Sequence, residues 1–306
     1  MKKRIFAGLT AILTLLALTA CGGNPDGKEL LKKAAANTDP VTYTTMKMDL
    51  SIEDLTGTGL GMAMLMEGQG TENTMILDCD FNLLGSSAKD TLYMDVSATS
   101  PQIYFEGTDG AWYSIEGEME DSLSSLNSLS AMGNSQMLSM FPSLCSEIKT
   151  IGKETLDGRS VYKIQLVLDG NKMLEGSLSG IDMEGLDQED LNEAAEAVQQ
   201  VMDMIKIHIY VEADTSRFAG TSVTLDKEAY KAFMVAQGAD EENLAMVDGI
   251  NLSVDATVHY DEKDISLPAG TANATPLTDE EEIMEKMPLM QGLMSILSMA
   301  NNLSGM

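Results

Sequence analysis

The feature that most limits the fold of this chain is a series of short segments in which apolar and polar residues alternate. Residues 46–53 show the pattern clearly, because every second side chain is apolar and those between are polar. Successive side chains of a β-strand point to opposite faces, so this pattern predicts a strand with one buried face. The apolar side chains of that strand are Met46, Met48, Leu50 and Ile52.

The same alternation recurs along the chain, and turn residues separate the repeats. Gly57 and Gly59, then Gly68 and Gly70, are interpreted as turns, and Asp157-Gly158 is a strong signal for a tight hairpin. Many strands joined by short turns favour an antiparallel sheet. Further strands are predicted over residues 60–66, 72–84, 92–96, 103–105, 112–115, 147–168 as a hairpin, 205–211, 218–225 and 250–260.

Helical spacing occupies fewer segments. Residues 28–37 predict a short helix, 117–145 two short helices, and 187–204 an acidic amphipathic helix, whereas 226–248 are interpreted as helix or loop. The last segment, 276–306, predicts a methionine-rich amphipathic helix with Thr278 as its N-cap. Pro288 would kink this helix or start a new one. Such an apolar tail must pack into the body, meet a partner or touch a membrane.

The front of the chain carries its most specific motif. Three basic residues precede an uncharged run over 5–20, which at 16 residues is shorter than the roughly 20 that a spanning helix needs. The run ends in "LTAC" at 18–21, which resembles the bacterial lipobox. This resemblance implies that residues 1–20 are a removed signal peptide and that Cys21 carries the lipid, with 21–27 as a flexible tether. The alternative is a plain signal peptide with an incidental cysteine.

The charge of the chain restricts its partners. The whole chain has 19 basic and 48 acidic residues, and the first 20 residues contain three of the basic ones. After their removal, 16 basic minus 48 acidic residues leave a net charge of −32. Such a body repels nucleic acid and anionic lipid headgroups. We therefore exclude nucleic acid and expect the lipid, not the protein surface, to hold the body at the membrane.

Methionine is unusually frequent, with 24 residues against 6 phenylalanines and 1 tryptophan. Its flexible thioether adapts to irregular apolar space, which suits either a variable apolar ligand or a soft filled core. Copper binding by thioethers has no support from the two histidines. The candidate cavity-lining residues are Met46, Met48, Leu50, Met62, Met64, Leu77 and Phe81.

The other chemistry-bearing residues give no catalytic signature. Cys79 and Cys145 are 66 residues apart and could form a disulfide worth about 4 kcal/mol, or remain buried free thiols. His208 and His259 fall on the polar sides of their strands, where a structural role is expected. No nucleophile-elbow, zinc-protease or phosphate-loop motif is present in the sequence. We therefore expect no enzyme activity, no metal and no cofactor.

The order of elements adds a family resemblance. A short first helix, a long run of antiparallel strands, the segment "IHIYVEADTSRFAGTSVTLD" at 207–226 and an "ISLP" exit at 265–268 resemble LolA/LppX-type lipoproteins. The resemblance implies an α+β fold in which a strongly curved antiparallel half-barrel packs on helices, as one domain over 28–275. The helix near 187–204 and the C-terminal helix over 276–306 are additions to that layout. Cys21 is the sole site residue that the resemblance carries over.

Two functions are compatible with these observations. The resemblance implies a lipoprotein on the extracytoplasmic face of the cell membrane that binds or carries a lipid or another hydrophobic molecule. The alternative is a surface or envelope-structural lipoprotein that docks a protein partner through residues 283–306. An apolar void of about 300 Å³ or more would favour the first hypothesis, and a fully packed interior the second.

Overall fold

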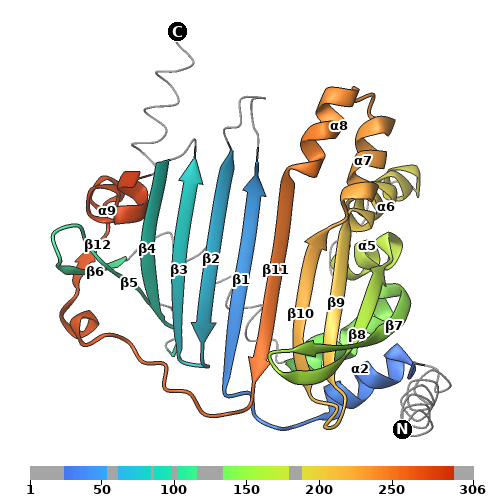
Figure 1. Ribbon diagram of the computed structural model, residues 1–306, viewed down its shortest axis with the longest axis horizontal. Helices are drawn as coiled ribbons and strands as arrows, with labels where there is room; N and C mark the ends of the chain where they lie inside the picture. The colour runs from blue at the N-terminus through green and yellow to red at the C-terminus, as the bar shows by residue number, and fades with distance from the viewer. Residues whose placement is uncertain are drawn as a thin grey trace, which may run out of the picture.

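The computed structural model describes residues 24–53, 61–83, 86–97, 102–115, 134–178 and 188–292. All twelve strands of this described part join a single open, curved sheet (Figure 1). The α+β class and the mostly antiparallel sheet that the alternation predicted are thus confirmed. The strands are β1 (Tyr43–Ile52), β2 (Met62–Gly70), β3 (Thr74–Leu83), β4 (Ser86–Asp95), β5 (Gln102–Glu106), β6 (Trp112–Ile115), β7 (Cys145–Leu156), β8 (Arg159–Leu168), β9 (Ile205–Glu212), β10 (Phe218–Leu225), β11 (Ile250–His259) and β12 (Thr275–Leu277).

The sheet is assembled from two meanders that meet in its middle. Its spatial order is β12-β6-β5-β4-β3-β2-β1-β11-β10-β9-β8-β7. The first meander runs from β1 outward to β6, and the second runs from β7 inward to β11. Ten residue pairs between β1 and β11 join them, from Tyr43 opposite His259 to Ile52 opposite Ile250. β12 pairs with β6 in parallel, whereas the sequence was interpreted there as an exit from the sheet.

The turns agree with the sequence at one hairpin and differ at another. Asp157 and Gly158 both have positive φ, 48° and 76°, and connect β7 to β8 as predicted. Gly68 and Gly70 were expected to form a turn but lie within β2, paired with Leu77 and Met75 of β3. The turn falls instead on residues 71–73, where the Thr71 hydroxyl accepts the Asn73 and Thr74 backbone N–H groups. Gly57 and Gly59 lie outside the described residues.

The described helices gather mainly beside β7–β11 (Figure 1). The helices expected at 28–37 and 187–204 are present as α2 and α6, and the second helix expected in 117–145 is α4. The first helix of that pair lies outside the described residues. The sequence interpretation missed α5. The helices are α2 (Gly27–Ala36), α4 (Asn134–Leu144), α5 (Gly170–Leu178), α6 (Gln188–Asp203), α7 (Lys227–Ala236), α8 (Glu241–Asp248), α9 (Glu280–Lys286) and the 3₁₀ helix η1 (Ala269–Asn273).

Two buried clusters lie at opposite ends of the same sheet face. At the β7–β9 end, α2 and α4 bury an apolar cluster against the strands. Its buried members are Leu30, Leu31, Ala34, Leu138, Cys145, Ile148, Ile164, Leu166, Ile209, Val211, Phe218 and Val258. At the β5–β6 end, the tail buries the second cluster, which consists of Ile103, Phe105, Tyr113, Ile115, Leu277, Ile283 and Met287.

The start of the tail therefore packs into the body. Asp279, not the expected Thr278, caps α9, because its side chain accepts the Glu281 and Glu282 backbone N–H groups at 2.9 and 3.1 Å. A helical stretch resumes at Pro288, in agreement with a new helix starting there. Residues 293–306 lie outside the described part.

Candidate functional site: the apolar face of the central strands

The candidate site is the face of strands β11, β1, β2, β3 and β4 that lies between the two buried clusters. Strand register places apolar side chains directly opposite one another, so they form rows across the sheet. One row consists of Val254, Met48, Met66 and Cys79, and ends at Asp90. The next row consists of Leu252, Leu50, Met64, Phe81 and Ala88.

All seven residues predicted to line a cavity lie on this face. Met46, Met48 and Leu50 come from β1, Met62 and Met64 from β2, and Leu77 and Phe81 from β3. Leu77 is buried at 5% exposure and the other six are half-buried. The structure thus brings the predicted set together on one surface, while their contact with a ligand stays a prediction.

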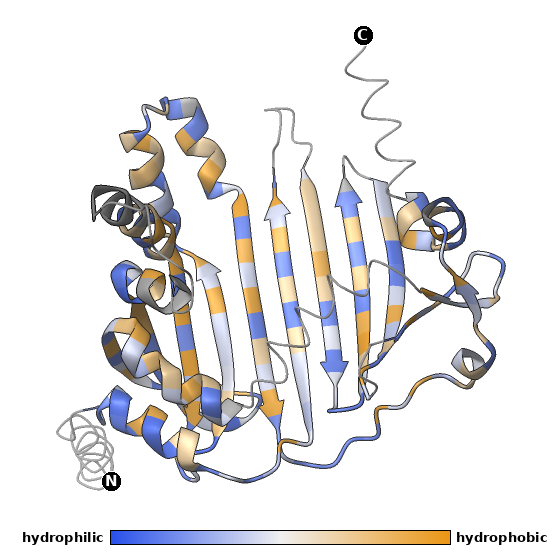
Figure 2. Ribbon diagram, turned by 180° about the vertical axis from the view of Figure 1, so that it is seen from behind, coloured by the Kyte–Doolittle hydropathy of each residue, from blue (hydrophilic) through white to orange (hydrophobic). Residues whose placement is uncertain are grey.

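The described helices lie toward the two ends of the sheet, on either side of the central strands. Figures 1 and 2 show helices at the β7–β11 side and α9 beside β4–β6, with β1, β2 and β3 running between them. Alternating hydropathy along these strands appears as alternating bands in Figure 2. The central face is therefore lined by pliable apolar side chains that are neither fully exposed nor packed into either buried cluster.

Asp90 interrupts the apolar face. It stands opposite Cys79, accepts the Thr91 backbone N–H at 2.8 Å and accepts the Leu289 backbone N–H of the tail at 3.4 Å. Burial raises the pKa of Asp90, and the two N–H donors offset part of this effect. Sequence reasoning missed Asp90, although its place between Ala88 and Leu92 on the apolar side of β4 was the available signal.

The two remaining cysteines are separate. Cys79 on β3 and Cys145 on β7 are buried free thiols. Six strands of the sheet lie between β3 and β7. The disulfide that the sequence allowed is thus absent from this structure, because the two strands occupy distant places in the sheet order. Burial raises the pKa of each thiol to about 11, which keeps both protonated and unreactive at neutral pH.

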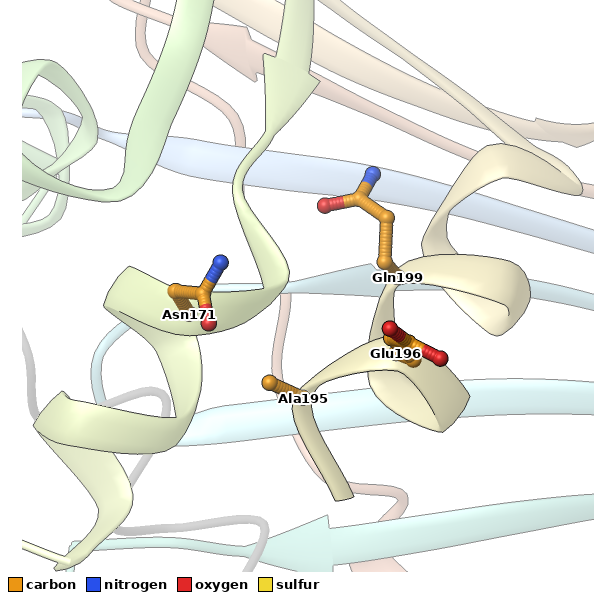
Figure 3. A pocket seen from close by; sticks show the side chains of 4 residues that line it. All are labelled: Asn171, Ala195, Glu196 and Gln199. Carbon is orange, nitrogen blue, oxygen red and sulfur yellow. The ribbon is translucent and has the colours of Figure 1, made fainter. Parts of the chain in front are cut away.

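Two hollows in the described part differ from the predicted apolar cavity. One, of about 290 Å³, lies between α5 and α6 and is lined by Asn171, Ala195, Glu196 and Gln199 (Figure 3). The Gln199 amide is occupied there, since it accepts the Gly170 N–H at 2.7 Å and donates to Asp203 at 2.7 Å. The other, of about 490 Å³, is lined by Thr45, Met46, Lys47, Glu67, Gly68, Gln69, Ile76, Asp78, Asp157, Asp255 and Thr257.

This second hollow lies mainly on the polar face of the sheet, opposite the candidate site. Of the seven predicted lining residues, only Met46 contributes to either of these two hollows. The structure therefore supplies an apolar surface for the site, and its enclosure is not shown by the described residues.

The histidines have structural surroundings. His259 stacks on Tyr43 with ring centroids 4.2 Å apart, and its Nε2 lies 3.2 Å from the Thr45 hydroxyl. Burial lowers the pKa of both His208 and His259. Within the described residues, no group of three or more His, Cys, Asp or Glu side chains could hold a metal ion. Among the described helices, none is long and apolar enough to cross a bilayer.

Comparison with known proteins gives distant structural likenesses only. No protein-family model matches the chain, and no curated protein matches it. The structure is similar to lipoprotein LppX of Mycobacterium tuberculosis at 12% identity and a TM-score of 0.37, covering 79% of this chain and 97% of that one. It is similar to LprF of Mycobacterium bovis at 9% identity and a TM-score of 0.38, covering 80% and 96%.

A LolA superfamily protein of Nitrosomonas europaea is also similar, at 10% identity and a TM-score of 0.20, covering 80% of this chain and 96% of that one. These likenesses are to lipoproteins and LolA-superfamily proteins, at identities and TM-scores too low to assign the chain to a family.

Proposed function

We propose that this chain is a membrane-anchored, extracytoplasmic lipoprotein that binds or carries a hydrophobic, lipid-like molecule on the apolar face of a half-barrel. The observation that carries the proposal is the set of apolar rows across β11, β1, β2 and β3. A row such as Val254, Met48 and Met66 offers neighbouring apolar side chains on one surface. Because these side chains are half-buried, a bound apolar molecule would remove further apolar area from water.

The composition of the face suits a ligand with long, flexible chains. Met46, Met48, Met62, Met64 and Met66 follow one another across two adjacent strands. Unbranched thioether side chains change rotamer at low cost, so one surface can accommodate acyl chains of different length. Aromatic rings or β-branched side chains would impose a fixed shape instead.

The proposed mode of action is binding, without catalysis. The described thiols have pKa values of about 11, so neither offers a thiolate nucleophile at neutral pH. His259 is held by its stacking on Tyr43. The proposal for the membrane anchor rests on the sequence at 18–21, because Cys21 lies outside the described residues.

Partner docking through the tail is less favoured for the part that the structure describes. Ile283 and Met287 are 6% exposed and contact the cluster around Phe105 and Tyr113. Side chains already buried in their own sheet are not available to a second protein. The proposal for residues 293–306 is unaffected, since they lie outside the described part.

The proposed ligand is tested by native mass spectrometry of the mature chain, extracted from its own membrane and then stripped of the anchor by cleavage near residue 22. Co-purifying lipid, or an apolar dye bound with micromolar affinity, is the expected result. A protein that carries no lipid and takes up no apolar probe would overturn ligand binding.

The anchor is tested separately. Incorporation of labelled palmitate is expected in the full chain and absent from Cys21→Ser. A Cys21→Ser protein that remains firmly in the membrane fraction would contradict the anchor, while leaving the ligand measurement unaffected.

A further inference from the structure

The segment after the expected lipid site is fixed to the body at the β7 edge. The Asn24 side-chain amide donates to the backbone carbonyls of Thr150 and Ile151 at 3.2 and 3.3 Å. The Thr150 hydroxyl donates to the Pro25 carbonyl at 2.6 Å, and Asp26 caps α2. The tether that the sequence predicted over 21–27 is thus already fixed from Asn24 onward.

This attachment limits the distance between the body and a lipid on Cys21. Three residue steps separate Cys21 from Asn24. A fully extended chain spans at most about 3.5 Å per residue, so Cys21 lies within roughly 10 Å of Asn24. The edge formed by α2 and β7 must therefore lie next to any membrane that holds the lipid.

The basic side chains of the body divide into two groups. Eleven of the 16 that follow Cys21 have an acidic or amide partner or a backbone acceptor in the described part: Lys47, Lys89, Arg159, Lys163, Lys172, Lys206, Arg217, Lys227, Lys231, Lys263 and Lys286. The other five have no ion pair or side-chain hydrogen bond with described residues: Lys28, Lys32, Lys33, Lys149 and Lys153. All five lie on α2 or β7.

These five lysines surround the point where the chain enters the body, and their side chains are exposed. Lys149 directly precedes Thr150, and Lys153 follows Ile151 by two residues, with its ammonium 4.8 Å from the Tyr162 ring centroid. Acidic side chains without a partner among the described residues are fewer on α2 and β7 than these lysines. Of the four acids near them, Asp26 caps α2 and Glu154 pairs with Lys163, and the other two are Glu29 and Glu147.

We propose that the α2–β7 edge, defined by these five lysines, is the surface that faces the membrane, and that its lysines contact the phosphate groups of anionic phospholipids. The inference rests on the proposed lipid at Cys21. Lysines near an anionic leaflet are attracted by its negative surface potential. The many acids elsewhere are screened beyond a Debye length of about 8–10 Å, so the net charge of the body does not cancel this local attraction.

The proposal also orients the molecule. α2 and β7 lie at one end of the long axis, and α9 and β12 lie at the other (Figure 1). With the α2–β7 edge on the membrane, the long axis points away from it, and the end that carries the tail is the far one. Under this proposal the lysines of the α2–β7 edge hold the body at the membrane together with the lipid, whereas the sequence analysis expected the lipid alone to do so.

The test fixes the anchor chemically, so that it does not depend on lipidation in the cell. A chain beginning at Cys21 is coupled to maleimide-headgroup lipid in vesicles of phosphatidylcholine with 30% phosphatidylglycerol. Cys79 and Cys145 are buried with pKa values of about 11 and react slowly, which directs coupling to Cys21. A trace of phospholipid with a photoreactive headgroup then marks the residues that touch it, and mass spectrometry maps the adducts.

We expect at least fivefold more adducts in α2 and β7 than in α7 and α8, and a loss of most of this excess in 0.5 M salt. Changing the five lysines to glutamine should reduce the α2–β7 adducts at least threefold. A control that changes Lys47, Lys89, Lys227, Lys231 and Lys286 to glutamine alters the net charge equally and should leave the adducts unchanged. Circular dichroism checks that both variants fold.

Adducts spread evenly over the body would overturn the orientation. Headgroup contact would be overturned if the α2–β7 adducts of the wild type were as frequent in pure phosphatidylcholine as in the anionic vesicles. It would also be overturned if the five-lysine variant gave as many of these adducts as the wild type. Failure of palmitate labelling in cells would contradict the proposed lipidation and would leave this measurement interpretable.

Discussion

Glu212 is a buried acid that joins three parts of the second meander. Its carboxylate accepts hydrogen bonds from Arg159 at 3.0 Å and from Arg217 at 2.8 Å, and a further one from the Thr215 hydroxyl. Arg159 also donates to the Val258 carbonyl at 2.8 Å. The group therefore fixes the start of β8, the turn after β9 and the end of β11 to one another.

We predict that Glu212→Gln lowers the free energy of unfolding by roughly 2–3 kcal/mol at pH 7, because two partly buried arginines lose their counter-charge. Burial alone would raise the pKa of Glu212, but the hydrogen bonds from Thr215, Arg217 and Arg159 outweigh it and lower the pKa. The stabilisation is thus present above the ordinary glutamate pKa of 4.5 and is lost as pH falls through the lower folded value.

Urea unfolding at several pH values checks this, and the difference between wild type and variant should shrink below pH 4.5. The exposed Glu67, paired with Lys47, is the matched control, and Glu67→Gln should cost under about 1 kcal/mol. Equal effects of the two substitutions would contradict the structural role of Glu212.

The pKa of Asp90 is shifted in the opposite direction to that of Glu212. Because burial raises its pKa, the folded state binds the proton more tightly than the unfolded state does. The charged carboxylate therefore lowers stability above the folded pKa, and the penalty disappears as pH falls below the ordinary aspartate range.

We predict that Asp90→Asn raises the free energy of unfolding by about 0.5–1 kcal/mol at pH 7, since the amide oxygen can still accept the Leu289 N–H. Thermal unfolding at pH 7 and near pH 3 should show the gain only at the higher pH. Asp49→Asn, on the opposite face of β1, is the control with no expected gain. A loss of stability at pH 7 would show that the charge of Asp90 is needed by the tail.

At the scale of elements, the strands could be predicted because apolar and polar residues alternate within the sequence of each strand. β1 and β11, which join the meanders, showed the clearest pattern, and Asp157-Gly158 correctly predicted the hairpin between β7 and β8. Gly68 misled because glycine usually marks turns, whereas here it fits a strand position where an added Cβ would lie 3.1 Å from the Leu77 side chain. That close approach belongs to β3 and cannot be read from β2.

Features that depend on distant segments could not be predicted. β12 is three residues long and becomes a strand only through its pairing with β6, more than 150 residues earlier. For the candidate site, the seven apolar residues were predicted together because they share a period of two. Asp90 was missed although its position between Ala88 and Leu92 places it on the apolar side of β4. Its hydrogen bond from the Leu289 backbone N–H comes from a distant segment and could not be predicted.

The packing of the tail against β5 and β6 allows a test of whether one element stabilises another. Replacing Ile283 and Met287 by alanine removes two buried side chains from the cluster at β5 and β6. We predict a loss of about 3 kcal/mol or more in stability, because large-to-small changes in a packed cluster leave cavities. Hydrogen exchange should accelerate in β5 and β6 while the amides of β8 and β9 stay protected.

Glu281→Ala, at an exposed position on the same helix, serves as the control and should leave exchange in β5 and β6 unchanged. Unaltered exchange in the double variant would mean that the first turn of the tail does not stabilise the sheet. In that case the tail would again be available for a partner.

For the whole molecule, the two meanders form one continuous face with a packed cluster at each end. The charged and polar side chains lie mostly on the other face, so the sheet separates a solvated side from an apolar one. Met66 and Leu65 are neighbours on β2 that point to these two sides, opposite Met48 and Asp49 of β1 respectively. Both are half-buried, which makes them a matched pair for testing which side takes the ligand.

We predict that Met66→Lys weakens binding of an apolar dye or co-purified lipid at least tenfold, because an ammonium in the centre of the rows must be desolvated when the ligand binds. Leu65→Lys introduces the same charge one residue away on the opposite face and should change the affinity less than twofold. Fluorescence titration measures both affinities, and circular dichroism and thermal unfolding confirm that the two variants fold comparably. A loss of binding that is equal in both variants would place the ligand elsewhere, and unchanged binding in Met66→Lys would show that the apolar rows do not contact it.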